Sequence, residues 1–456
     1  YSVLLKNYRE KVQKDAPFKQ ILTGDETFGV GLLGFTGKSI AGLDKAVFTA
    51  NLPSRQLEVN DSPRDLTFLW RSPDGIVIEK TYKFAPDTYA ISMEVIIKNG
   101  SGRGIQDKLF VALYSKAPGD KRMYAFEGPS ALINDKLEEI KTKKLKDQNT
   151  FDGKIKWVAL QSRYFMSGLI PDQIEEASLH LALQSDKFVA ARYRQPEKAI
   201  QPGTQYTYKY QLFMGPKRIQ ELRNVGNDLQ KVVDFGWFDI IAKPCLWLMN
   251  LFYSVIPNYG VAIIIMTLLV KLLLWPLGQK SYKSMSEMKK IQPLMKEIRE
   301  KYKDDKQRMN QEVMGLYRTY KINPLGGCLP MVVQLPVFFA LYRMLYEAIE
   351  LRHAPFFLWI DDLAAPDRLF RFDFSIPFME PPYGIPVLTV VMGASMLLQQ
   401  KMSPPMGDAT QAKMMMFMPI IFTVIFINFS SGLVLYWLVN NILSIAQQYY
   451  TQKKYA

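Results

Sequence analysis

A lysine inside an apolar run is the residue of this sequence that most needs a chemical explanation. Lys271 stands between Val270 and Leu272 and is the single charged residue of the run 259–276. A charge at membrane depth costs a few kcal/mol or more unless it meets water or a polar partner. Two interpretations stay open. The amine faces a water-filled groove beside Thr267, one helical turn earlier, or its stem reaches head groups about 6 Å away along the helix axis.

Polar residues also recur in the other apolar runs. Buried amides need hydrogen-bonding partners, and a water-filled cavity would supply them. Pro336 and Pro419 interrupt two of the runs and leave further backbone groups unpaired. Arg343 and Glu347 lie four residues apart and are expected to form a structural pair. The amides are Gln334, Gln399, Gln400, Asn440 and Asn441. This polar content favours a groove around Lys271.

Patterns that indicate catalysis or cofactor binding are weak. Residues 31–39, GLLGFTGKS, resemble a phosphate-binding loop but place five residues between Gly31 and Gly37 where the motif needs four. We interpret them as a loop between strands. His180 and His353 lie in different halves of the chain, and the two cysteines offer no thiol site. We therefore predict no enzymatic activity, no metal and no cofactor.

The elements that must position Lys271 divide into two classes. The chain has 456 residues, 48% of them hydrophobic, and a mean hydropathy of −0.06. Residues 1–217 alternate apolar and polar side chains in short runs between turns, of which 72–75 (SPDG) is an example. Many such runs without intervening helices predict a large antiparallel β-sandwich. The charged stretch 135–146 is expected to be a solvated insertion between strands.

The second half reads as helices in and along a membrane. Residues 218–257 are interpreted as a linker and an amphipathic helix at the membrane interface. Residues 258–450 are the predicted membrane core, because about 20 apolar residues cross the hydrocarbon layer. The predicted spans are 259–276, 329–349, 385–400, 414–429 and 433–448.

A helical hairpin is predicted at 280–321, between the first two spans. An apolar stripe that includes Met285, Met288 and Met295 runs along its first helix. One interpretation is an arm that captures partners through adaptable methionine contacts. The other is a solvated connector.

Charge predicts the orientation of the spans. Twelve Lys/Arg and six Asp/Glu lie between Gly278 and Gly326, against three and five between Leu351 and Gly384. The first loop and the C-terminus are therefore predicted to be cytoplasmic and the second loop outside. Residues 1–217 then also lie outside, so we expect a signal or signal-anchor helix upstream of Tyr1.

Five motifs of the second half, taken in order, resemble the YidC membrane protein insertase family. The first half resembles the periplasmic domain of its Gram-negative branch. The resemblance covers the whole second half and is specific. The motifs are DFGW at 234–237, NPLGGCLP at 323–330, QKMSP at 400–404, FMP at 417–419 and SGLVLY at 431–436.

The resemblance implies a β-supersandwich periplasmic domain and five helices around a hydrophilic groove. That groove would open to the cytoplasm and to lipid. Lys271 takes the groove position where the Gram-negative proteins usually have arginine, which keeps the charge but loses the bidentate fork. Trp437 stands where the family often has tyrosine. The groove residues implied are Lys271, Thr267, Gln334, Asn440, Tyr436 and Trp437.

The expected function is insertion of nascent membrane proteins, alone or with the Sec translocon, by a multi-pass inner-membrane protein. Expected partners are nascent membrane proteins, the Sec translocon, membrane lipids and the ribosome, which the net charge of +14 suits. We expect a functional monomer and no specific DNA binding. One alternative is a solute transporter with an outer receptor domain, although no internal repeat is visible. A second is a sugar-modifying enzyme, because mutarotases share the outer fold, but residues 1–217 hold one histidine, His180.

Overall fold

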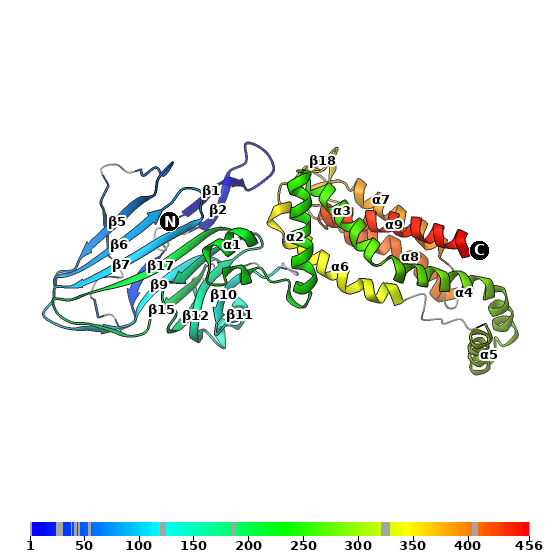
Figure 1. Ribbon diagram of the computed structural model, residues 1–456, viewed down its shortest axis with the longest axis horizontal. Helices are drawn as coiled ribbons and strands as arrows, with labels where there is room; N and C mark the ends of the chain where they lie inside the picture. The colour runs from blue at the N-terminus through cyan, green and yellow to red at the C-terminus, as the bar shows by residue number, and fades with distance from the viewer. Residues whose placement is uncertain are drawn as a thin grey trace. The chain divides into compact units, whose positions relative to one another are not determined.

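The chain divides into two units, Tyr1–Asp234 and Phe235–Ala456, in the computed structural model (Figure 1). The motif at 323–330 lies almost entirely outside the described residues, as do Lys38 of the phosphate-loop-like segment and Pro404 of the QKMSP motif. Side chains are also not described at 2, 22–23, 329–333, 409–413 and 455. The structure describes all residues except 1, 24–30, 38, 41–42, 44–45, 53–55, 119–124, 185–187, 321–328, 404–408 and 456.

The first unit is a large β-sandwich, as the alternating pattern predicts. Its main sheet runs in the order β3-β9-β15-β14-β12-β13-β17-β7-β6-β5-β4, with β10 and β11 joined to β12. The strands are β1 (Ser2–Arg9), β2 (Phe18–Thr23), β3 (Leu32–Phe35), β4 (Thr49–Ala50), β5 (Arg64–Arg71), β6 (Ile76–Phe84), β7 (Ala90–Asn99), β8 (Ile105–Asp107), β9 (Leu109–Lys116), β10 (Gly128–Ile133), β11 (Lys136–Glu139), β12 (Thr150–Gln161), β13 (Phe165–Pro171), β14 (Glu176–Gln184), β15 (Phe188–Arg194), β16 (Lys198–Ile200) and β17 (Gln205–Pro216).

Strand β12 connects the two halves of the sandwich. Its first residues, through Lys154, pair with β14, and its last, from Val158, pair with β13. Gly153 lies near the change of partner with φ of 147°, a conformation that strongly favours glycine. Between the halves, every second residue of a strand such as β7 is buried, and Trp157 of β12 is fully enclosed.

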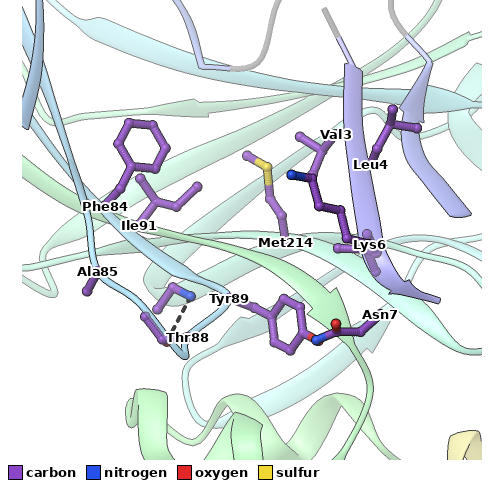
Figure 2. A pocket seen from close by; sticks show the side chains of 12 residues that line it. Val3, Leu4, Lys6, Asn7, Phe84, Ala85, Thr88, Tyr89, Ile91 and Met214 are labelled. Atoms are coloured by element: carbon purple, nitrogen blue, oxygen red, sulfur yellow. Dashed lines mark hydrogen bonds between the residues drawn. The ribbon is translucent and has the colours of Figure 1, made fainter. Parts of the chain in front are cut away.

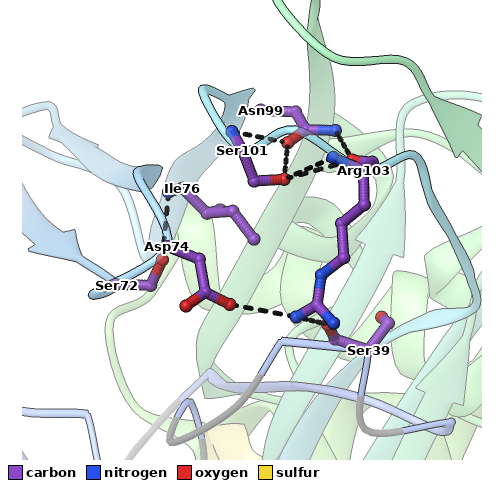
Figure 3. A network of polar contacts seen from close by, with 7 residues as sticks. All are labelled: Ser39, Ser72, Asp74, Ile76, Asn99, Ser101 and Arg103. Atoms are coloured by element: carbon purple, nitrogen blue, oxygen red, sulfur yellow. Dashed lines mark hydrogen bonds and ion pairs between the residues drawn. The ribbon is translucent and has the colours of Figure 1, made fainter.

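The predicted turn at 72–75 is confirmed, and Figure 3 shows how it is held. The Ile76 backbone N–H donates to Ser72 Oγ at 3.0 Å, and Gly75 adopts φ of 90°. Arg103 and Asp74 form an exposed ion pair at 3.0 Å. The hairpin of β5 and β6 therefore closes with the residues that its sequence predicts.

The prediction of a solvated insertion at 135–146 is correct for the exposure of most of its residues and wrong for its structure, because residues 136–139 form strand β11. Asn134 and Asp135, both at positive φ, form the tight turn between β10 and β11. Ile140 and Leu145 then return to the core. The pairing partner of β11 is β10, the strand directly before it, so the charged residues 136–139 belong to a β-hairpin.

The segment that resembles a phosphate-binding loop binds a carboxylate of its own chain. Asp107 is buried and accepts hydrogen bonds from the Gly37 and Ser39 backbone N–H groups, at 2.9 and 3.2 Å. The Thr36 and Ser39 hydroxyls donate at 3.0 and 2.8 Å, and the Lys108 N–H at 2.7 Å. These donors are therefore already used, which argues against nucleotide binding here.

Asp107→Asn is expected to destabilise the first unit by about 2 kcal/mol near neutral pH, because the amide turns a donor toward these N–H groups. Burial by itself would raise the pKa of Asp107, and the hydrogen bonds outweigh it and hold the pKa below its ordinary value. A depressed pKa stabilises the fold above the unfolded pKa of about 3.9, and this contribution is lost as pH falls through the lower folded pKa. The melting temperatures of the wild type and Asp107→Asn should therefore begin to converge below about pH 4 and should lie closest below the folded pKa. The exposed Asp74→Asn is the control, with a small effect.

The second unit is helical apart from one small hairpin of strands. Helix α1 (Ile219–Val225) still belongs to the first unit, so the division falls after the sequence-based boundary at 217. In the second unit, α9 contacts α3, α4, α6 and α7. The elements are α2 (Asp239–Val255), α3 (Tyr259–Leu273), α4 (Trp275–Lys301), α5 (Lys306–Thr319), α6 (Leu329–Glu347), β18 (Leu369–Phe372), β19 (Tyr383–Ile385), α7 (Val387–Met402), α8 (Ala409–Phe426) and α9 (Ser431–Tyr455).

A helix that crosses a bilayer needs about 20 predominantly apolar residues. Over the described part of the chain, each helix taken by itself is too short or too polar to cross a membrane. Helices α3 and α4, with a bend of 64° between them, are long and apolar enough only when they are taken together. Met414–Phe426 is a shorter apolar helix.

Candidate functional site

A row of polar side chains along α9 forms the candidate site. These residues are buried although α9 is largely apolar at its start, so their polar atoms must be satisfied inside the bundle. Their spacing of three and four residues keeps them along one side of the helix. They are Asn441, Ser444, Gln447, Gln448 and Thr451.

Lys271 of α3 joins this row. Its amine Nζ donates to Ser444 Oγ at 2.6 Å, and the Ser444 hydroxyl donates to the Asn440 backbone oxygen at 2.7 Å. Ser444 is buried and Lys271 is half-buried. The Tyr282 hydroxyl lies within hydrogen-bonding reach of Ser444 and Gln399. Polar groups of the bundle therefore hold the cation. Among the described residues, no carboxylate pairs with it.

Three further predicted residues meet one helical turn earlier on α9. Gln334 of α6 donates from Nε2 to Asn440 Oδ1 at 3.0 Å. The Tyr436 side chain is buried and within hydrogen-bonding reach of Gln334. Since Asn440 also accepts from Ser444, a continuous polar chain links α3, α9 and α6.

Thr267 is brought near this chain but does not join it through a described contact. Its side chain is buried, and its hydroxyl donates to the Ile263 backbone oxygen at 2.6 Å. This bond within the helix satisfies the donor without water. A groove role for Thr267 stays a prediction.

Trp437 lies in an aromatic cluster at the other side of the polar chain. Its ring lies 4.6 Å from that of Phe338, 5.0 Å from Phe426 and 6.2 Å from Phe422. These contacts bring α6 and α8 together on α9. The indole Nε1 is buried and has no hydrogen-bond partner among the described residues. An unpaired buried donor of this kind is unfavourable.

The predicted methionine stripe is buried by α5. Met288, Ile291 and Met295 of α4 pack against Val313, Leu316 and Tyr317, and Met285 is also buried. Asp305 accepts from the Arg308 N–H at 3.0 Å and so begins α5, as its place in the turn predicts. The predicted pair Arg343–Glu347 is also formed, at 3.1 Å.

Sequence reasoning missed Ser444 and the two glutamines, Gln447 and Gln448. Gln447 donates to the Trp275 backbone oxygen at 2.9 Å, and Gly278 leaves space for its amide. The available signal was the regular recurrence of polar residues from Asn440 to Thr451, in a helix that continues the last apolar run.

The described cavities of the first unit are separate from this site. One of about 480 Å³ adjoins Asp107 and Arg194. Figure 2 shows the other, about 230 Å³, between β1 and the connection of β6 to β7, where Val3, Tyr89 and Met214 line it. No residue predicted for the groove lines either cavity.

Comparisons with known proteins cover both units. The family profile described as "YidC periplasmic domain" matches residues 1–248, and that described as "60Kd inner membrane protein" matches 251–456. The membrane protein insertase YidC of Syntrophus aciditrophicus (strain SB) is 43% identical over 99% of this chain and 81% of the relative. That of Syntrophobacter fumaroxidans (strain DSM 10017 / MPOB) is 42% identical over 98% and 82%. A crystal structure of an active YidC insertase with its first transmembrane domain resolved aligns over 89% of this chain and 84% of that one, at 19% identity and a TM-score of 0.41.

Proposed function

Since this chain belongs to the YidC family of membrane protein insertases, we propose that Lys271 and the polar chain around it are its client-binding groove. The family is non-enzymatic and belongs to the inner membrane, and the first unit matches its periplasmic domain. The observation that carries the proposal is the Lys271–Ser444 bond. It holds a cation among polar groups inside the bundle, where an acidic segment of a client would find it.

The groove would work by lowering a solvation barrier. A hydrophilic flank of the client meets Lys271, Gln334 and Asn440 in place of hydrocarbon, so its polar groups stay partnered during passage. The apolar helix of the client then moves into lipid and gains about 25 cal/mol per Å² of buried apolar surface. Exposed apolar side chains such as Val390 and Leu398 of α7, and Ile420 and Ile425 of α8, would face that lipid.

The proposed topology has five spans, α3 and α6 to α9. The charge counts favour α4, α5 and the C-terminus on the cytoplasmic side, and the first unit and the loop from α6 to α7 on the other. The basic cytoplasmic segments suit an anionic partner such as the ribosome. Cooperation with the Sec translocon and function as a monomer are part of the same proposal.

Client capture by Met285, Met288 and Met295 would require α4 and α5 to separate. These three side chains lie in the contact between the two helices, so a client would have to replace α5 there. Exposed Met314 of α5 is available without such a change. Capture by the hairpin is thus proposed as an exchange of apolar contacts.

Photo-crosslinking to a stalled nascent chain tests the groove. A crosslinking amino acid at Gln334 or Trp437, both half-buried, should capture the client during insertion. The control is Ile442, which is exposed on α9. We choose these positions over Thr267 because its side chain is fully enclosed. Equal capture from Ile442 and Gln334, or none from either groove position, would contradict the proposed path.

A further inference from the structure

The loop that joins α6 to α7, residues 348–386, directs bulky apolar side chains outward. Six of them are between 45% and 90% exposed. The loop also carries the polar residues Asp361, Asp373 and Glu380. Apolar side chains are therefore exposed although polar ones are present in the same loop. An apolar concentration of this kind on a folded protein marks an interaction surface. The six are Phe357, Leu358, Phe370, Phe374, Phe378 and Ile385.

Three of these residues adopt backbone conformations that are unfavourable for their type. Leu358, Phe370 and Phe378 have φ of 60°, 49° and 66°. A bulky side chain at positive φ is rare and costs free energy that the surrounding structure must supply. All three side chains are nevertheless strongly exposed, between 74% and 90%.

A polar framework holds the loop in this arrangement. Asp367 accepts from Trp359 Nε1 at 2.6 Å and also from the Leu388 N–H at the start of α7. Asp362 accepts from the His353 and Ala364 N–H groups, at 3.0 and 2.8 Å. Asp362 therefore holds the loop together, and Asp367 and buried Arg368 tie it to the start of α7 and to the end of α8. The exposed apolar groups are thus presented on a preorganised support.

Neighbouring phenylalanines of the loop divide between two environments. The Phe356 ring packs directly over Gly260 at the start of α3, where a methyl group would lie only 2.0 Å from it. The Phe357 ring lies 4.5 Å from that of Phe356 but is exposed, and Leu358 is almost completely exposed. The loop therefore contacts the bundle at Phe356 and leaves an apolar face, formed by the six side chains named above, largely exposed.

We propose that this apolar face inserts into the outer leaflet of the bilayer, at the boundary of head groups and acyl chains. The inference rests on the proposed function in one respect: α6 and α7 are spans, so that their connection emerges at the membrane surface. The apolar face is then continuous with the lipid-facing sides of these helices. Phenylalanine and leucine are typical of apolar faces that are buried at that depth. The acidic residues of the loop argue against attraction to anionic lipid, so a zwitterionic surface suffices.

Nitroxide labels on the full chain in phosphatidylethanolamine and phosphatidylglycerol vesicles test this proposal. With both native cysteines replaced by alanine, single labels are placed at Leu358→Cys and Phe378→Cys. Asp373→Cys is the control for an exposed polar site of the same loop, and Val390→Cys for the lipid-facing side of α7. Labels at 358 and 378 should collide preferentially with oxygen, as at 390, whereas the label at 373 should collide preferentially with a water-soluble nickel complex.

The possible outcomes distinguish a failure of the proposed loop insertion from a failure of the proposed function. Water-like collisions at 358 and 378, with lipid-like collisions at 390, would overturn the insertion of this loop and leave the spans intact. Shielding of 358 and 378 from both reagents would also overturn it, because protein would then cover the face. Water-like collisions at 390 as well would remove the span at α7, and with it the proposed function.

Discussion

Lys271→Glu is expected to reduce insertion of clients with acidic outer segments at least about tenfold, a loss of roughly 1.4 kcal/mol. Two unit charges 8 Å apart at an effective dielectric constant of 20 interact by about 2 kcal/mol. The substitution replaces this attraction by a repulsion of the same size, so tenfold is a conservative expectation. The assay is insertion into proteoliposomes that contain the purified variant.

The matched variants distinguish charge from geometry. Lys271→Arg should retain insertion, because bulk attraction to a carboxylate needs only the positive charge. Ser444→Ala removes the oxygen that binds the amine at 2.6 Å but keeps the cation, so its defect should be smaller. A client whose outer segment is made basic should reverse the order of wild type and Lys271→Glu. Equal insertion by both proteins for acidic and basic clients would refute the role of this charge.

Local pattern predicts the parts of the sandwich where one strand face is buried and the other is wet. Strand β7 has this alternation from Met93 to Asn99, and β6 has it over its first residues. Strand β13 does not, because all its residues from Phe165 to Pro171 are buried, so the alternating pattern does not identify it. A strand enclosed on both faces carries no period, and only its neighbours in the sheet identify it.

The sequence predicts those residues of the site that are polar or charged within an otherwise apolar run. Lys271 stands out in an apolar run, and Gln334 and Asn440 were found in the same way. That these two amides bond with each other, at 3.0 Å, depends on the packing of α6 on α9. Ser444 was missed because serine in an apolar helix is unremarkable until a cation from another helix reaches it. Helix rotation and partner choice are tertiary properties, which one sequence does not encode locally.

The methionines illustrate the opposite error. Their stripe on α4 was correctly placed, and its amphipathic spacing is real. An apolar stripe predicts that something covers it but does not say what does. Here the covering partner is α5 of the same chain, through Val313, Leu316 and Tyr317.

Arg368→Ala is expected to lower the free energy of opening of the loop between α6 and α7 by about 3 kcal/mol, because buried oxygens lose a charged donor. The Arg368 guanidinium donates from Nε to the Pro382 oxygen and from Nη1 to the Ile427 oxygen, both at 2.8 Å. Nη2 donates to Asn428 Oδ1 at 3.3 Å. One buried side chain therefore ties the loop to the connection of α8 to α9. Arg368→Lys should rescue little, since one ammonium group cannot reach oxygens around the planar fork.

Limited proteolysis within the loop measures this opening directly. At about 1.4 kcal/mol per tenfold change, 3 kcal/mol corresponds to cleavage roughly a hundred times faster when opening and closing are rapid. Arg371→Ala is the matched control, because Arg371 is exposed and lies 3.6 Å from exposed Asp361, so its loss should change cleavage little. If both variants were cleaved at the wild-type rate, Arg368 would not hold the loop. Rapid cleavage of Arg368→Ala alone would mean that the hydrogen bonds of this buried cation are needed to keep the loop closed, in addition to its apolar packing.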